Sequence, residues 1–160
     1  MLKKSLCCLL AFVFVGAFLT GCGDRLDTKR IAWSESQGIV FSYDKKTLVK
    51  YNRDLPHKEY VIPDGVTTIG EGAFEDCRSL RSVTIPSSVK TIGKKAFAWC
   101  ESLTSVTIPK SVTTIGDGAF WGCENLRSVT IPPSVKEIGE EAFAFCPCGK
   151  SVKRQFPNYR

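Results

Sequence analysis

The chain has 160 residues, of which 43% are hydrophobic and 24% charged, and its formal net charge is +6 at pH 7. This balance excludes a disordered chain and a bundle of membrane helices, and it fits one folded domain. Much of the positive excess lies at the C-terminal end, in Lys150, Lys153, Arg154 and Arg160. A modest charge at one end does not make a nucleic-acid binder, so we expect no nucleic-acid partner.

Residues 1–21 predict a signal peptide. Lys3 and Lys4 form a basic start, and the apolar segment 6–19 is shorter than the roughly 20 residues that a membrane-spanning helix needs. The sequence LTGC at residues 19–22 resembles the lipobox of bacterial lipoproteins, a family in which the cysteine carries a diacylglyceryl group and begins the mature chain. The resemblance implies that Cys22 anchors the protein to a membrane through lipid. An ordinary signal peptide with a coincidental cysteine is the alternative.

The residue after Cys22 bears on the location of the anchored protein. Gly23 stands where an aspartate would favour retention in the inner membrane. We therefore expect an exported protein at the bacterial outer membrane or cell surface, with the periplasmic face as the alternative. Removing Lys3 and Lys4 with the signal lowers the formal charge from +6 to +4.

Residues 22–37 are expected to form a linker, and residues 38–61 an N-terminal β-hairpin cap. The sequence GIVFSYDKKTLVKY (38–51) has two alternating runs around Asp44-Lys45-Lys46, which is typical of a hairpin. An open solenoid end exposes apolar core and needs such a cap.

From Ile62 the sequence repeats itself every 23 residues. The frame I-P-x-x-V-x-x-I-G-x-x-A-F-x-x-C recurs in four copies: 62–84, 85–107, 108–130 and 131–153. Self-similarity at this period indicates a solenoid, in which each unit buries its apolar face against its neighbours. The run LRSVTI (80–85) predicts a short strand that ends at Pro86, and VKTIGKKAFAWC (89–100) predicts a short helical or 3₁₀ arc. The fourth copy is atypical, as expected of a terminal unit, and a basic tail (154–160) follows it.

A strand and a helical arc in 23 residues are typical of an α/β solenoid of the leucine-rich repeat class. The frame closely resembles that of BspA-like bacterial surface leucine-rich repeat proteins over residues 62 to about 152. The resemblance implies a protein partner, with host and extracellular matrix proteins among the candidates, and a role in adhesion without catalysis. The alternative is a periplasmic or envelope scaffold, or a glycan-binding lipoprotein.

One cysteine stands at the same phase of each repeat: Cys77, Cys100, Cys123 and Cys146. Metal sites need converging ligands and usually include histidine, whereas the only histidine, His57, precedes the repeats. We therefore interpret these residues as a structural cysteine ladder packed in the core, and we expect no metal and no cofactor. The pair Cys146 and Cys148 leaves a redox or disulfide role open. A hydrolytic role for His57 would need a paired serine and oxyanion donors, and we expect no catalytic residues.

Two sets of variable or exposed positions are candidates for binding. Trp99, Trp121 and Phe145 precede the ladder cysteines and could form an exposed aromatic strip, since aromatic side chains are common binding anchors. Shielding of the convex side between coils is the alternative. The second candidate is the strand face, which has a row of hydroxyls flanked by Arg81 and Arg127; pairing of the hydroxyls across coils is its alternative. The hydroxyl residues are Ser82, Thr84, Ser105, Thr107, Ser128 and Thr130.

Overall fold

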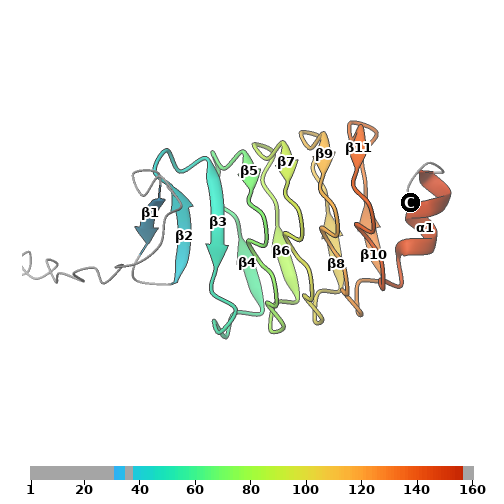
Figure 1. The fold of residues 1–160 in the computed structure, drawn as a ribbon, viewed down its shortest axis with the longest axis horizontal. Coiled ribbons are helices and arrows are strands. Elements are labelled where there is room, and N and C mark those ends of the chain that lie inside the picture. Colours follow the sequence, from blue (N-terminus) through green and yellow to red (C-terminus); the bar gives the residue numbers. More distant parts are fainter. Residues whose placement is uncertain (1–30, 35–37, 157–160) are drawn as a thin grey trace, which may run out of the picture.

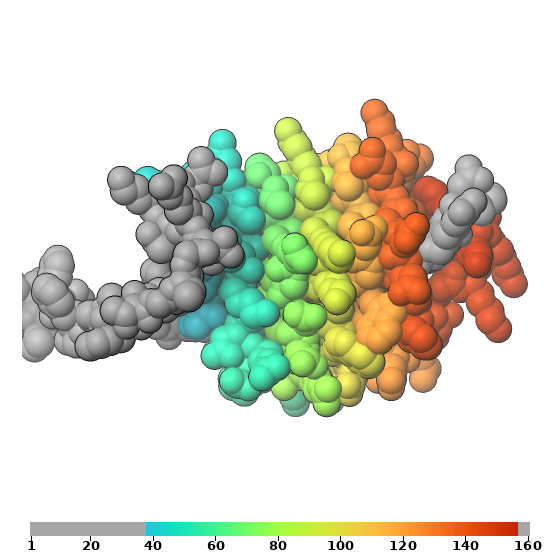
Figure 2. All heavy atoms as spheres, in the orientation of Figure 1, coloured from blue at the N-terminus to red at the C-terminus, as the bar shows by residue number. Residues whose placement is uncertain are grey.

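The computed structural model describes residues 31–34 and 38–156 of the chain (Figure 1). The predicted signal peptide, Cys22 and residues 157–160 of the basic tail lie outside the described residues, as does most of the predicted linker. The chain winds into a row of coils, with the N-terminal strands at one end and a short helix at the other (Figure 1). The space-filling view shows these coils as successive bands in contact with one another (Figure 2).

The strands form two sheets. The seven-stranded sheet has the order β1-β2-β3-β5-β7-β9-β11, and the four-stranded sheet has the order β10-β8-β6-β4. The first comprises β1 (Ile31–Ser34), β2 (Ile39–Ser42), β3 (Thr47–Tyr51), β5 (Thr68–Ile69), β7 (Thr91–Ile92), β9 (Thr114–Ile115) and β11 (Glu137–Ile138). The second comprises β4 (Glu59–Val61), β6 (Ser82–Thr84), β8 (Ser105–Thr107) and β10 (Ser128–Thr130). Strands from successive coils pair in parallel, with each residue opposite its equivalent 23 positions away.

The predicted solenoid of 23-residue units and the predicted S-V-T strands are confirmed, but the arc is less helical than its sequence suggests. Residues 91–92 form a second strand, and residues 94–99 form consecutive turns. Lys95 (φ 51°) and Trp99 (φ 60°) adopt left-handed conformations that a helix cannot accommodate. The amide groups of the arc therefore bond to the neighbouring coil, as Phe97 N–H does to Ala119 O at 2.7 Å.

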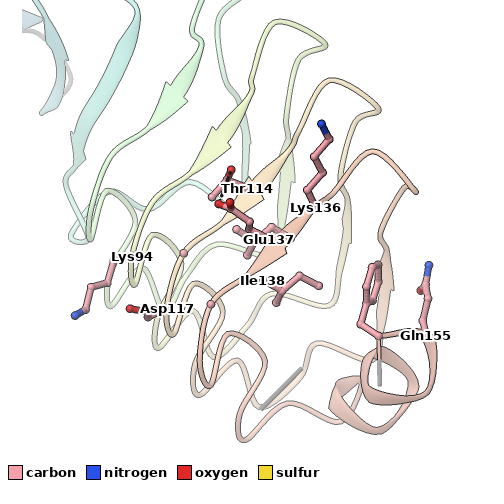
Figure 3. A pocket seen from close by; sticks show the side chains of 11 residues that line it. Lys94, Thr114, Asp117, Lys136, Glu137, Ile138 and Gln155 are labelled. Carbon is pink, nitrogen blue, oxygen red and sulfur yellow. Dashed lines mark hydrogen bonds between the residues drawn. The ribbon is translucent and has the colours of Figure 1, made fainter. Parts of the chain in front are cut away.

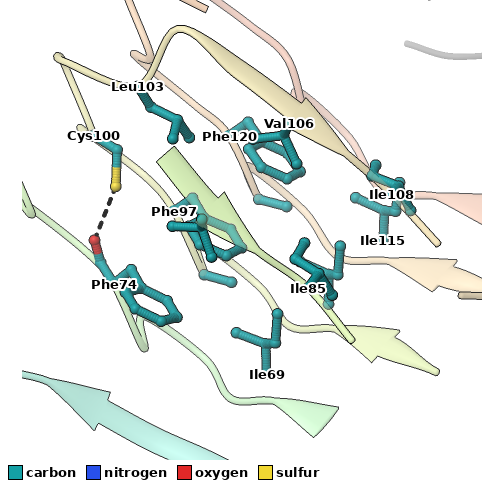
Figure 4. Packing of buried hydrophobic residues seen from close by; sticks show 14 of the residues in the cluster. Ile69, Phe74, Ile85, Phe97, Cys100, Leu103, Val106, Ile108, Ile115 and Phe120 are labelled. Atoms are coloured by element: carbon teal, nitrogen blue, oxygen red, sulfur yellow. Dashed lines mark hydrogen bonds between the residues drawn. The ribbon is translucent and has the colours of Figure 1, made fainter. Parts of the chain in front are cut away.

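The core consists of columns of identical side chains, one from each coil (Figure 4). Its centre is a ladder of four phenylalanines whose rings stack at centroid distances of 4.8, 5.1 and 5.1 Å: Phe74, Phe97, Phe120 and Phe143. Each ring is at most 1% exposed. Since burial of a phenylalanine stabilises a fold by about 1.5–3 kcal/mol, this ladder is a large part of what holds the coils together.

The repeated glycine of the I-G pair is required by close approach of successive backbones. A Cβ on Gly116 would lie 2.6 Å from the backbone nitrogen of Lys94, and one on Gly93 would lie 2.8 Å from Ile69 O. Backbone atoms cannot yield as the end of a flexible side chain can. Glycine at this phase therefore sets the spacing between coils.

The N-terminal end is covered by the expected hairpin. Strands β2 and β3 pair antiparallel, and β3 then pairs in parallel with β5, so the hairpin extends the seven-stranded sheet of the solenoid. Tyr51 is 1% exposed, and its ring contacts Tyr60 and Phe74 at centroid distances of 4.8 and 5.1 Å. The last part of the predicted cap differs in role, because β4 is the first strand of the four-stranded sheet.

The C-terminal end carries α1 (Gly149–Gln155), a helix that the sequence did not predict and that crosses the expected boundary between residues 153 and 154. The fourth repeat has Gly149 where the other copies have a buried leucine, so no further S-V-T strand forms. Val152 of α1 is buried instead, and Gln155 Nε2 donates to Ile131 O at 3.1 Å. The helix thus covers the end of the core.

Candidate binding surface

The ladder cysteines lie at the boundary between core and turn. Cys77, Cys100 and Cys123 are buried, Cys146 is half-buried, and all four are free thiols. The thiols of Cys100, Cys123 and Cys146 donate to the carbonyl of the phenylalanine in the preceding coil, at 3.1, 3.1 and 2.9 Å. Figure 4 shows this contact for Cys100 and Phe74. Each of these three thiols therefore donates a hydrogen bond to a backbone oxygen and packs as a small apolar side chain.

The environment of four thiols, Cys77, Cys100, Cys146 and Cys148, raises the pKa and so opposes ionisation, and nucleophilic chemistry requires the thiolate. Burial raises the pKa of Cys100, and burial also raises that of Cys77 to about 12. Hydrogen bonding with the Cys123 thiol is the main cause that raises the pKa of Cys146 to about 12. Hydrogen bonding with Cys146, followed by burial, raises the pKa of Cys148, whose side chain is 2% exposed.

The other candidates for chemistry are His57 and a possible metal site. His57 Nδ1 lies 2.9 Å from the Tyr51 hydroxyl at the N-terminal cap, and its ring stands edge-on to the Tyr51 ring. Within residues 31–34 and 38–156, no group of three or more histidine, cysteine, aspartate or glutamate side chains is arranged so that it could hold a metal ion.

The structure brings Trp99, Trp121 and Phe145 together in one row. The Trp99 and Trp121 rings meet edge-to-face at a centroid distance of 4.3 Å, and Trp121 and Phe145 meet likewise at 5.2 Å. Trp99 is 37% exposed and Phe145 is 73% exposed. We call these three side chains the aromatic strip. Exposed aromatic area in a soluble fold is the kind of surface that anchors binding partners.

The backbone beneath the aromatic strip is in an unusual conformation. Trp99 and Phe145 have φ angles of 60° and 59°, a region that costs a bulky residue about 1–2 kcal/mol. The equivalent positions in the other coils are Asp76 (φ 64°) and Gly122 (φ 69°), residue types that tolerate this conformation better. The Trp99 ring covers Gly122, where a Cβ would lie 2.8 Å from Trp99 Cε3. Two large aromatic residues thus occupy positions that the fold does not require to be aromatic.

A groove of about 390 Å³ borders the aromatic strip. The residues around it are Glu75, Lys94, Lys95, Ala98, Trp99, Asp117, Gly118, Trp121, Glu140 and Glu141. The sequence alone does not associate Lys94, Lys95, Glu140 or Glu141 with the aromatic residues. The signal that could have done so is the repeat itself, because all four stand at equivalent or adjacent phases.

The second candidate surface is the outer face of the four-stranded sheet. The parallel register places Ser82, Ser105 and Ser128 in one row, and Thr107 beside Thr130 in another. Arg81 and Arg127 are exposed at the start of β6 and β10, and their amide groups bond to Lys58 O and Thr104 O. Within the described residues, no hydrogen bond, ion pair or ring contact connects either arginine to the aromatic strip.

A larger hollow of about 620 Å³ lies beside β9, β11 and the end of α1 (Figure 3). Glu137 and Thr114 point toward each other there, with Glu137 Oε2 accepting from Thr114 Oγ1 at 3.5 Å, while Gln155 stands across from them on α1. This hollow lies at the last strand of the seven-stranded sheet, where no further coil follows in the described chain.

Together, the parallel coils, the repeating core columns and the exposed variable arc define a solenoid protein of the leucine-rich repeat class. A BspA type leucine-rich repeat region, with six copies, matches residues 51–157. The chain therefore belongs to the BspA type leucine-rich repeat family.

Solved structures agree with this assignment. A leucine-rich repeat protein from Bacteroides capillosus is 30% identical with a TM-score of 0.62, and the match covers 73% of this chain and 92% of that one. The pneumococcal vaccine antigen PcpA is 26% identical with a TM-score of 0.70, and the match covers 74% of this chain and 29% of PcpA. A leucine-rich cell surface protein from Faecalibacterium prausnitzii is 28% identical with a TM-score of 0.55, covering 68% of this chain and 36% of that one.

The chain thus spans well under half the length of the last two proteins. No curated protein matches the sequence. In the part of the chain that the structure describes, no helix has the length and apolar character needed to cross a bilayer.

Proposed function

We propose that this protein is an exported, lipid-anchored surface protein whose solenoid binds a protein partner through the aromatic strip, without catalysis. The observation that carries the proposal is the row of Trp99, Trp121 and Phe145, in which Trp99 and Phe145 are exposed and Trp121 is half-buried. Trp99 and Phe145 have a strained backbone conformation, and the equivalent positions of the other coils are occupied by aspartate or glycine. The fold does not require a bulky residue at these positions, so a role at the surface is the simplest reason for them.

Two observations support the proposed location. The lipobox-like sequence before Cys22 supports a lipid anchor, and one of the similar solved structures, 28% identical, is described as a cell surface protein. Host and extracellular matrix proteins are the proposed partners. A surface made of few coils presents a small area, so clustering of lipid-anchored copies would raise the effective affinity for a large partner.

The anchor is tested by fractionation of cells that express Cys22→Ser. We expect the wild-type chain in the membrane fraction and the variant in the soluble exported fraction or as uncleaved precursor. A variant that is processed normally and stays with the membrane would contradict lipid anchoring at Cys22.

Protease treatment of intact cells distinguishes the proposed adhesin from an envelope scaffold. An outward-facing protein should be degraded, whereas a periplasmic control protein should survive. Protection of the chain until the outer membrane is permeabilised would favour the scaffold or glycan-binding alternative.

The binding surface is tested by capture of partners from matrix and envelope extracts. We expect the wild-type chain to retain a partner that Trp99→Ala combined with Trp121→Ala does not. Arg81→Ala combined with Arg127→Ala is the matched variant on the strand face, and it should bind as wild type. Loss of capture only in the arginine variant would move the site to the four-stranded sheet.

A further inference from the structure

The groove beside the aromatic strip joins aromatic rings with carboxylates. Trp99 and Trp121 form part of its wall, and Asp117, Glu140 and Glu141 are exposed around it. Its volume of about 390 Å³ is at the lower end of the range for sites that hold small ligands or single side chains. The groove is therefore large enough to receive part of a partner.

The charge of this groove is opposite to that of the chain. Four carboxylates and two lysine ammonium groups border it, which gives a net charge of −2, whereas the whole chain has +6. The two lysines come from one coil, and Glu140 and Glu141 come from a coil two units further along the solenoid. The acidic character is thus strongest toward the C-terminal side of the groove.

The carboxylates of the groove are available to a ligand. Among the described residues, the ion pairs join Arg53 and Arg78 to Asp76 and Glu101, and none involves a groove residue. Asp117 Oδ1 accepts from the Glu140 amide at 3.0 Å, which leaves its other oxygen and both glutamate carboxylates without a partner in the described chain.

Aromatic faces and unpaired carboxylates recognise the same kind of group. A guanidinium or ammonium is attracted by the face of a tryptophan ring, and it forms charge-assisted hydrogen bonds with carboxylates. An acidic partner segment would meet net repulsion here, and a purely apolar one would leave the carboxylates desolvated.

We propose that this groove binds a lysine- or arginine-rich segment of the partner protein, with a cationic side chain held between the Trp99–Trp121 pair and the carboxylates of Glu140 and Glu141. The inference rests on the proposed function, since it specifies the partner chemistry of the same surface. The proposed occupant of the groove is a basic segment of another protein and not a second copy of this chain.

The test uses the full-length chain in a non-ionic detergent and two fluorescent peptides, an eight-residue alternating Gly-Arg peptide and its Gly-Glu counterpart. We expect saturable binding of the Gly-Arg peptide that weakens as salt rises, and no binding of the Gly-Glu peptide. Equal binding of both peptides would overturn the proposal.

The decisive variant is Glu140→Gln combined with Glu141→Gln, which keeps the shape and removes the charge. We expect about a tenfold or larger loss of affinity for the Gly-Arg peptide. Glu59→Gln combined with Glu124→Gln is the matched control, because both residues are exposed and lie outside the groove. The proposal is wrong if the two double variants bind alike.

Two further outcomes separate this inference from the proposed function. If partner capture is lost in Trp99→Ala with Trp121→Ala but is unchanged in Glu140→Gln with Glu141→Gln, the aromatic surface stands and the basic-segment inference falls. Sedimentation velocity should show a monomer at micromolar concentration. Self-association that the glutamine variant abolishes would assign the groove to basic residues of a second copy, such as Lys153 and Arg154 of α1, and it would also overturn the proposal.

Discussion

Phe97 and Trp99 stand two positions apart in the same arc, yet they belong to opposite regions of the molecule. Phe97 is fully buried and stacks on Phe74 and Phe120, whereas Trp99 is 37% exposed and has a left-handed backbone. The buried position repeats without exception in four copies, and the exposed one changes in each: Asp76, Trp99, Gly122 and Phe145. The difference separates what the fold requires from what the surface is free to vary.

The largest expected effect comes from opening the buried ladder. Phe120→Ala removes a ring from between Phe97 and Phe143, and we expect it to lower the free energy of unfolding by about 3–5 kcal/mol in urea titration. Phe145→Ala, at an exposed position one coil on, should change it by less than about 0.5 kcal/mol. Equal effects from the two substitutions would contradict the division between ladder and strip.

Gly122 connects the two regions, because the Trp99 ring lies directly over it. Gly122→Ala places a Cβ against that ring and also forces alanine into a left-handed conformation, so we expect a loss of about 2 kcal/mol. In a Trp99→Gly background the clash disappears and about half of this cost should remain. A double-mutant cycle by denaturant unfolding measures the coupling, and additive effects would show that the Trp99 ring does not rest on Gly122.

A smaller effect is expected from the thiol column. Cys100→Ala removes the donor to Phe74 O and leaves a small void, which should cost about 1–2 kcal/mol. Cys100→Ser retains a donor in nearly the same volume, and it should recover part of this loss. An equal loss of unfolding free energy in Cys100→Ser and Cys100→Ala would contradict a stabilising role for this hydrogen bond.

Stability should also depend on pH at the alkaline end. The pKa values of Cys77 and Cys146 are raised from an ordinary value of 9.0 to about 12, and burial raises that of Tyr51 from 10.0 to about 12. The folded state therefore disfavours the ionised forms. The stability that these groups contribute is complete below about pH 9, and it is lost as pH rises toward 12. Melting temperature between pH 8 and 11 checks this, and Cys77→Ser with Cys146→Ser should flatten the decline.

A small effect on stability is also expected at Trp99 itself. Trp99→Gly loses ring contacts with Trp121 but relieves the left-handed strain, so its free energy of unfolding should stay within about 1 kcal/mol of wild type. Asp76→Gly tests the equivalent backbone position of the first coil, where no aromatic side chain stands. A large loss in Trp99→Gly alone would make the indole a structural side chain.

The repeating part of the fold could be predicted from the sequence because each core position is stated four times. The columns of phenylalanine, cysteine and isoleucine follow from a fixed period, and the S-V-T strands follow from local alternation. The hairpin before them is equally clear, since Asp44-Lys45-Lys46 separates two alternating runs.

Two features within the repeats were missed for identifiable reasons. The Thr-Ile strands have only two residues, too few for a period to appear. The arc resembles a helix in its apolar spacing, and apart from Asp76 and the glycines its left-handed residues are lysine, tryptophan, glutamate and phenylalanine, which give no local sign of that conformation. Alignment of the repeats does give one, because Gly72, Gly118 and Gly122 occupy the same phases.

The sequence draws attention to the aromatic residues of the candidate site but not to its charged residues. Trp99, Trp121 and Phe145 interrupt a regular pattern, so they attract attention in the sequence. Glu140 and Glu141 are ordinary surface residues until the coils are stacked, and only the stacking places them at one groove with residues from two coils earlier.

Binding is assigned to the aromatic strip, and stability to the phenylalanine ladder beneath it. The most direct measurement is adhesion of cells that display the chain to matrix-coated surfaces, with Trp99→Ala combined with Trp121→Ala and with surface display quantified. We predict that adhesion falls to the level of cells without the protein while the purified variant unfolds cooperatively. Adhesion that persists in a folded variant would contradict the claim.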